Sequence, residues 1–135
     1  MYTITNISEK YNLPASTIRY YEEIGLLENV EHTGGYRRVF NDSHMDRMAA
    51  IECFKKARLP LDEIKKFFEY EKDIQSNSSE ILAMMKAQEA KTLEEMENLS
   101  AGLAHIQKKI KYYTAVDNAI KEGRPIPGWC EIIDS

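Results

Sequence analysis

Residues 4–27 read ITNISEKYNLPASTIRYYEEIGLL, and their apolar side chains fall into two short clusters with helical spacing. Between the clusters lies Asn12-Leu13-Pro14. Asn12 tolerates the left-handed conformation that ends a helix, and Pro14 suits the entry to the next helix, where a missing N–H costs little. The stretch therefore predicts two short helices joined by a tight turn, which is helix-turn-helix geometry.

The residues that follow predict a hairpin and two further helices. A glycine pair at 34–35 precedes the aromatic and β-branched run 36–40, which indicates a hairpin with a positive-φ turn. Candidate N-caps at 41–43 start a helix expected over about 43–58, and another helix is expected over about 61–73. These elements are enough for a small compact core.

A different pattern begins after the polar run Ser76-Asn77-Ser78-Ser79, where Ser79 suits the cap of a helix starting at Glu80. From Glu80 to Glu122 no proline occurs, and apolar residues recur at alternating steps of three and four, as in the seam of a coiled coil. Such a helix would be about 64 Å long. No second long helix is expected to cover it, so we expect a homodimer rather than back-folding within one chain. The expected dimer contacts are Met96, Leu99, Leu103, Ile106, Ile110 and Tyr113.

Together these patterns predict a mainly α fold, in which a winged helix-turn-helix N-terminal domain is followed by a long dimerising coiled-coil helix. The expected divisions are 1–75 for the winged domain, 76–122 for the coiled-coil dimerisation helix and 123–135 for a C-terminal tail. The tail contains the one tryptophan of the chain, Trp129, and is expected to be docked rather than free.

The charge balance restricts the partners. The chain has 135 residues, with 18 Lys and Arg against 22 Asp and Glu, for a net charge of -4. This balance argues against bulk positive charge as the means of holding nucleic acid or a membrane, so an anion-binding surface must be local. No apolar run approaches the roughly 20 residues of a membrane helix, and residues 1–20 lack the features of a signal peptide. We expect a cytoplasmic protein without a membrane partner.

Metal and enzyme chemistry have little support. Cys53 and Cys130 are too few for a disulfide framework or an all-thiolate zinc site, and the three histidines are widely separated. No phosphate-binding loop and no paired catalytic signature occur. We therefore expect no metal, no cofactor and no enzymatic activity.

Three motifs carry a resemblance to a known family. The helix-turn-helix and wing of MerR-family transcriptional regulators resemble Thr17-Ile18-Arg19-Tyr20-Tyr21-Glu22, Gly25-Leu26-Leu27 and Gly35-Tyr36-Arg37. The likeness extends through residues 60–65 and the long helix. It implies a dimer with an antiparallel coiled coil that binds a palindromic element in double-stranded promoter DNA. It also implies activation at the promoter, with RNA polymerase as a partner, by distortion of an overlong promoter spacer.

Two positions depart from the family pattern. Pro14 stands where Ser or Thr is usual, so the cap of the second helix must be made differently. Glu31 stands in the loop before the wing, where an arginine is common. Loss of a cation and gain of an anion there should weaken DNA binding or make it more dependent on other contacts.

The second helix and the hairpin hold the expected DNA contacts. The N-terminal end of the helix would enter a major groove, where Arg19 can pair with a guanine edge or a phosphate, and the hairpin offers donors for backbone contacts. Adjacent strand residues point to opposite faces, so one wing arginine is able to pair instead with the glutamate at 22, 23 or 28, and the motif favours Arg37 as the DNA contact. The expected DNA-binding residues are Ser16, Thr17, Arg19, Tyr20, Tyr36, Arg37 and Arg38, whereas Ile18 and Tyr21 are expected in the core.

The sequence defines the effector less closely than it defines the DNA contacts. Cys53 is either a small buried apolar residue or a sensor thiol, activated by the cations at 55, 56 and 58 toward aldehydes and quinones. The second interpretation is similar to the thiol- and aldehyde-stress-responsive branch of the family, and Cys130 is either a second thiol or incidental. The metal-sensing and iron–sulfur branches require more cysteines than the chain has. The remaining candidate effector is a small apolar molecule bound by aromatic residues, although such residues more often serve packing. These aromatic residues are Phe67, Phe68, Tyr112, Tyr113 and Trp129.

A protein-interaction adaptor without specific DNA binding is the alternative function. The same domain and coiled coil can bind proteins, and the acidic balance requires no nucleic-acid role. Replacement of Arg19 separates the two functions, because only a regulator loses sequence-specific DNA binding.

Overall fold

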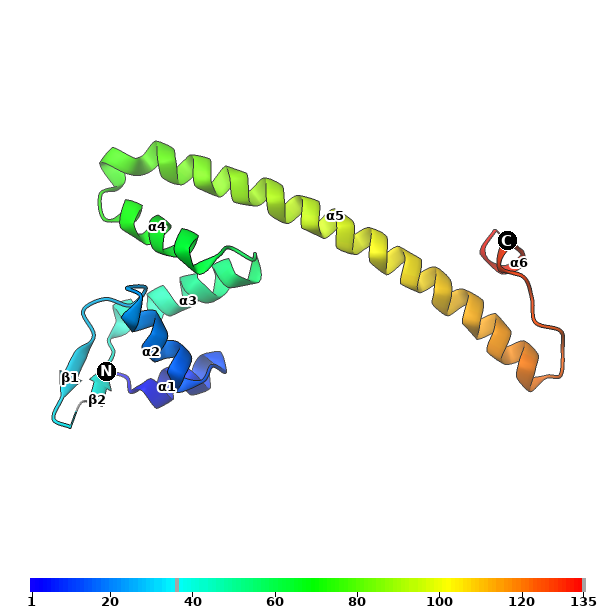
Figure 1. The fold of residues 1–135 in the computed structure, drawn as a ribbon, viewed down its shortest axis with the longest axis horizontal. Coiled ribbons are helices and arrows are strands. Elements are labelled where there is room, and N and C mark those ends of the chain that lie inside the picture. The colour runs from blue at the N-terminus through cyan, green and yellow to red at the C-terminus, as the bar shows by residue number, and fades with distance from the viewer. Residues whose placement is uncertain (36, 135) are drawn as a thin grey trace. The chain divides into compact units, whose positions relative to one another are not determined.

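The computed structural model describes residues 1–35 and 37–134. The predicted mainly α fold with an N-terminal helix-turn-helix, a wing and a long helix is confirmed (Figure 1). The elements follow in the order α1 (Ile4–Tyr11), α2 (Ala15–Glu23), β1 (Glu31–Thr33), β2 (Arg37–Val39), α3 (Asp42–Lys56), α4 (Leu61–Glu71), α5 (Ile74–Lys121) and α6 (Trp129–Ile133).

The helix-turn-helix forms as the local sequence predicts. Thr3 caps α1, because its Oγ1 accepts from the Asn6 N–H (3.1 Å) while the Asn6 Oδ1 accepts from the Thr3 N–H (2.8 Å). Asn12 ends α1 in the left-handed region, at φ 52°. Pro14 stands at the N-cap of α2 with φ -60°. The turn therefore depends on backbone conformations that these two residues favour.

The wing is an antiparallel hairpin of β1 and β2 in which His32 lies opposite Arg38. Gly35 supplies the positive φ of its turn, at 83°. The hairpin is continued by a bridge between Tyr2 and Phe40, whose backbones exchange two hydrogen bonds of 2.8 Å. The predicted hairpin is confirmed, and the N-terminal segment is bonded to its base. The placement of Glu31 in a loop before the wing is wrong, because Glu31 is the first residue of β1 and pairs with Val39.

The core of the N-terminal part packs α1 on α2 and α3 on α4. Phe67 stacks edge-on against both Phe54 and Phe68, with ring centroids 4.9 Å and 5.8 Å away. The buried apolar side chains are Ile7, Ile18, Tyr21, Leu26, Leu27, Phe40, Met45, Met48, Ile51, Leu59, Ile64 and Phe68. This core fixes the positions of α2 and the wing.

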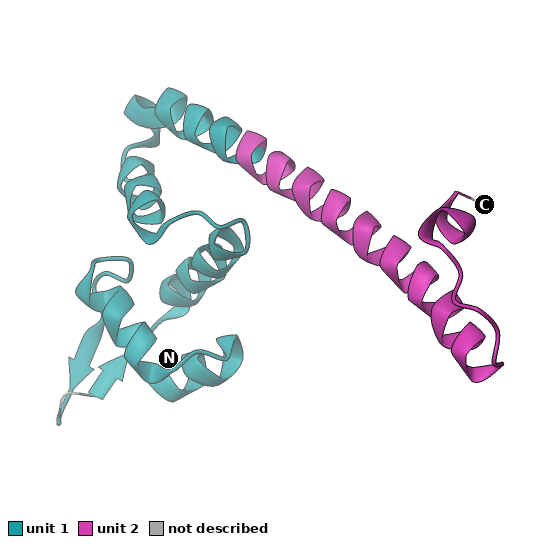
Figure 2. Cartoon of the chain, turned by 45° about the vertical axis from the view of Figure 1, so that its right-hand side comes forward, with its two compact units in different colours: residues 1–89 teal, residues 90–135 magenta. Residues whose placement is uncertain are grey.

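The long helix begins earlier than predicted. α5 runs from Ile74 through the polar residues 76–79, so a start at Glu80 with Ser79 as its cap is wrong. Asp73 is the capping side chain, since its Oδ1 accepts from the Ser76 N–H at 3.2 Å. The polar run faces solvent along much of its length and stays helical, although serine and asparagine are weaker helix formers than alanine. α5 continues through the boundary between two compact units, residues 1–89 and 90–135 (Figure 2).

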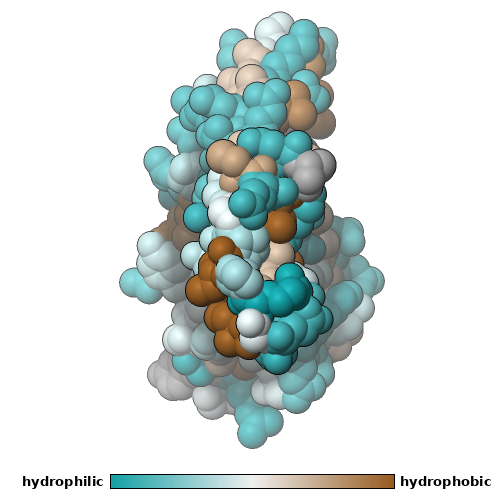
Figure 3. All heavy atoms as spheres, turned by 90° about the vertical axis from the view of Figure 1, so that its right-hand side faces the viewer, coloured by the Kyte–Doolittle hydropathy of each residue, from teal (hydrophilic) through white to brown (hydrophobic). Residues whose placement is uncertain are grey.

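The apolar seam of α5 is exposed. Met96, Leu99, Leu103, Ile106, Ile110 and Tyr113 each keep between 54% and 66% of their surface accessible. Figure 3 is viewed toward the C-terminal end of α5 and shows hydrophobic patches between hydrophilic ones. Within residues 1–35 and 37–134, no helix is both long and apolar enough to cross a membrane.

The C-terminal tail is docked on α5, as predicted. The Trp129 ring lies 5.2 Å from the Tyr112 ring, and Lys109 Nζ lies 4.6 Å from the Trp129 centroid. Tyr112 Oη donates to the carbonyl of Pro127 at 2.9 Å. These contacts hold the short helix α6, which the sequence did not predict.

Candidate nucleic-acid interface

Helix α2 has an inner and an outer face. Ile18 and Tyr21, three residues apart, are buried with 0% and 1% of their surface accessible. Ser16, Arg19 and Tyr20 are exposed and Thr17 is half-buried. Because a helix repeats every 3.6 residues, the burial of one face leaves the predicted DNA-binding side chains on the other.

The first turn of α2 carries no side-chain cap. Pro14 makes no side-chain hydrogen bond to the helix, and only its carbonyl bonds to the Thr17 N–H, at 3.0 Å. The departure from the usual Ser or Thr therefore leaves the first N–H groups of α2 without a capping side chain. Uncapped N–H groups and the helix dipole favour an anion such as a phosphate.

The two wing arginines have different surroundings. Arg38 Nε is bonded to Glu22 Oε2, and Glu22 Oε1 accepts from His32 Nε2 at 2.8 Å. Arg37 is exposed. The sequence left open which glutamate pairs with a wing arginine, and in the structure Glu22 pairs with Arg38. Arg37, which the motif favours as the DNA contact, is the exposed arginine. Tyr36 lies outside the described residues.

One hollow is lined by residues of α2, the wing and the start of α1. Its volume is about 350 Å³, and it is lined by Thr3, Ile4, Thr5, Arg19, Arg37 and Arg38. Three of the predicted DNA-binding residues thus meet at one place, whereas Ser16, Thr17 and Tyr20 do not line it. Thr3 and Thr5 are not among the predicted DNA-binding residues. In the sequence, the polar residues Thr3, Thr5 and Asn6 mark only the start of α1. Two hydroxyls and exposed guanidinium groups suit a DNA phosphate.

The pKa of Glu22 lies below its ordinary value of 4.5. Partial burial acts in the opposite direction, but the hydrogen bonds from Arg38 and His32 and their charges outweigh it. A depressed carboxyl pKa contributes stability above the ordinary pKa, and this contribution is lost as the pH falls through the depressed value.

A Glu22→Gln variant should therefore be less stable than wild type at neutral pH and approach it in acid. The difference in free energy of unfolding should be largest at about pH 7 and shrink below about pH 4.5. Urea unfolding followed by circular dichroism at a series of pH values measures it. A difference that stays constant down to the acid end of the series would contradict the role of the Glu22 charge.

Cys53 is exposed on α3, so the interpretation as a buried core residue is wrong. Lys55 directs its ammonium elsewhere, donating to Tyr21 Oη at 2.8 Å and to Glu52 Oε1 at 3.3 Å. Cys130 is exposed on α6. Among the described residues, no group of three or more His, Cys, Asp or Glu is placed to hold a metal ion.

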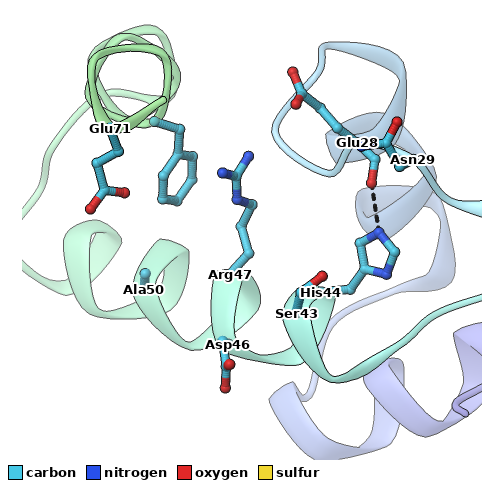
Figure 4. Close-up of a pocket in the computed structure, with 9 residues that line it drawn as sticks. Glu28, Asn29, Ser43, His44, Asp46, Arg47, Ala50 and Glu71 are labelled. Atoms are coloured by element: carbon cyan, nitrogen blue, oxygen red, sulfur yellow. Dashed lines mark hydrogen bonds between the residues drawn. The ribbon is translucent and has the colours of Figure 1, made fainter. Parts of the chain in front are cut away.

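A second hollow, of about 340 Å³, lies between α3, α4 and the loop after α2 (Figure 4). Arg47 stands in it with its guanidinium 4.1 Å from the Phe68 ring centroid. His44 is buried and donates from Nε2 to the carbonyl of Glu28 at 2.6 Å. These contacts join three segments of the core, and the hollow contains none of the predicted DNA-binding residues.

Comparison with known proteins identifies the family. The model of the MerR helix-turn-helix family of regulatory proteins matches residues 2–71, just over half of the 135 residues. The chain belongs to the MerR family. A MerR-family regulator from Bacillus thuringiensis has a solved structure with a TM-score of 0.69 and 31% identity, covering 81% of this chain and 96% of that one. The family resemblance inferred from the motifs is thus confirmed.

Two further similar proteins are described as regulators. The solved structure of HiNmlR, described as a MerR family regulator lacking the sensor domain and bound to promoter DNA, has a TM-score of 0.76 and 27% identity, and covers 91% of both chains. An uncharacterized helix-turn-helix transcriptional regulator of Haemophilus influenzae is 34% identical over 68 residues. That match covers 50% of this chain and 50% of the relative, so the chain spans about half the length of that curated protein.

Proposed function

We propose that this MerR-family chain is a dimeric, sequence-specific DNA-binding transcriptional regulator and not an enzyme. The observation that carries the proposal is the meeting of Arg19 from α2 and Arg37 from the wing at one hollow. A recognition helix and a wing that present cations together can hold a phosphate backbone while the helix reads a groove. The promoter-bound state of HiNmlR, a similar structure, supports double-stranded promoter DNA as the partner.

The homodimer is part of the same proposal. A single exposed helix with an apolar seam as long as that of α5 is best covered by a second copy. The winged domain is proposed to span 1–75, the dimerisation helix 76–122 and the tail 123–135. A two-fold symmetric dimer presents two identical reading surfaces, and therefore suits a palindromic DNA element.

The response to an effector is the finer part of the proposal. The dimer is proposed to distort its promoter DNA and to act there with RNA polymerase, in response to a reactive electrophile or a small molecule. The exposure of Cys53 on α3 supports the electrophile, since a sensor thiol must be reachable.

Selection from a pool of random DNA duplexes tests the proposal, because it requires no known promoter. The purified protein should enrich a motif with two-fold symmetry, here called the operator duplex. A pool that stays unenriched after repeated rounds would contradict the regulator and favour the protein-interaction adaptor.

The sensor role of Cys53 is tested by treatment with an aldehyde or a quinone. Treatment should change operator affinity by at least about fivefold in the wild type and in Cys130→Ser, but not in Cys53→Ser. Fluorescence anisotropy with the labelled operator duplex measures the affinity. A response that survives in Cys53→Ser would remove this thiol as the sensor.

A further inference from the structure

One carboxylate joins the recognition helix to both strands of the wing. Glu22, in the last turn of α2, accepts from His32 on β1 through Oε1 and from Arg38 on β2 through Oε2. His32 and Arg38 lie directly opposite each other in the antiparallel register. Each oxygen of the carboxylate therefore holds one strand of the same cross-strand pair.

The hairpin is too short to be stable without contacts such as those to Glu22. Each of its strands has three residues, and a two-stranded hairpin alone is marginally stable in water. The Glu22 and Arg38 side chains are both partly buried, at 21% and 26% exposed. Charge-assisted bonds in such a position are stronger than fully exposed ion pairs.

The position of Glu22 also relates the wing to the reading surface. Glu22 lies three residues after Arg19 on α2, which places the two side chains on neighbouring positions of one helix face. The bonds from Glu22 to His32 and Arg38 thus fix the position of the wing relative to Arg19. Arg38 also lines the hollow, but its charge is already balanced by Glu22.

We propose that Glu22 is a positioning residue with two effects on DNA binding. It orders the wing so that Arg37 is presented beside Arg19, and it withholds Arg38 from the DNA phosphates. This inference rests on the proposed DNA-binding function. An unpaired carboxylate at this place would repel DNA. Paired as it is, Glu22 is one of the groups that determine how selectively the chain binds DNA.

The test replaces Glu22 with glutamine, which keeps the size of the side chain and removes its charge. Affinities for the operator duplex and for a shuffled duplex are titrated over a series of salt concentrations. The ratio of the two affinities should fall about tenfold in Glu22→Gln, because the wing loses a charge-assisted anchor. The plot of log affinity against log salt should steepen by about one unit, because the released Arg38 neutralises a phosphate.

Two further variants separate positioning from other causes. Glu23→Gln makes the same charge change at the next residue, which is exposed, and should leave both quantities at their wild-type values. Glu22→Gln combined with Arg38→Gln should restore the wild-type salt slope. Partial unfolding would lower both affinities equally without changing the slope, and circular dichroism monitors the fold.

The outcomes are distinguishable. If wild type shows no selectivity for the operator duplex, the proposed function falls and this inference falls with it. If wild type is selective but Glu22→Gln behaves like Glu23→Gln, or if the slope stays steep in the double variant, the positioning role alone is overturned.

Discussion

Replacing Arg19 with alanine is expected to weaken binding to the operator duplex by about 10- to 100-fold, the effect of losing one good arginine contact to a base edge or a buried phosphate. Arg19 is exposed on α2 and lines the hollow with Arg37, so its loss removes a cation without opening the core. Titration of the labelled duplex measures the affinity.

The matched control for this change is Arg124→Ala. Arg124 is exposed in the C-terminal tail, and its guanidinium is paired with Glu122 at 2.5 Å. The same arginine-to-alanine change there should leave operator affinity close to the wild-type value. Equal affinities for the Arg19 and Arg124 variants would remove Arg19 from the interface.

A charge in the seam of α5 is expected to have the largest effect. Leu103→Glu would place a carboxylate in the middle of the apolar stripe, twice in each dimer, and ionised groups are costly to bury without partners. The dimer should dissociate at micromolar concentration. Operator affinity should fall by at least about 100-fold, because two linked half-site contacts become independent ones. Light scattering gives the mass, and titration gives the affinity.

Ala101→Glu introduces the same charge two residues earlier, off the apolar stripe. It should remain dimeric and bind the operator duplex like wild type. If Leu103→Glu stays dimeric, or if wild type itself has the mass of a single chain, the seam is not the dimer interface.

The helix-turn-helix could be predicted because its signals are local. Asn12 and Pro14 favour the backbone conformations that they adopt, and the apolar clusters on either side already have helical spacing. The turn and second strand of the wing are equally predictable, since the glycine pair precedes a short aromatic and β-branched run and Gly35 takes the positive φ. Such elements depend on neighbouring residues rather than on distant packing.

Other features depend on packing that the sequence does not display. The predicted start of α5 is wrong because Asp73 lies just before a polar run that is also acceptable inside an exposed helix. Thr3 and Thr5 line the hollow only because the start of α1 lies beside α2 and the wing. Strand alternation allowed several glutamate partners for a wing arginine, and the packing of the hairpin on α2 determines that Glu22 is the one for Arg38.

We propose sequence-specific binding of DNA by a dimer. It is tested most directly by titrating the purified protein with the operator duplex and with a shuffled duplex of the same composition, at a low and a physiological salt concentration. We expect binding to the operator at least about 1,000-fold tighter than to the shuffled duplex at the higher salt, with two chains per duplex. Equal affinities for the two duplexes, both lost at the higher salt, would contradict it.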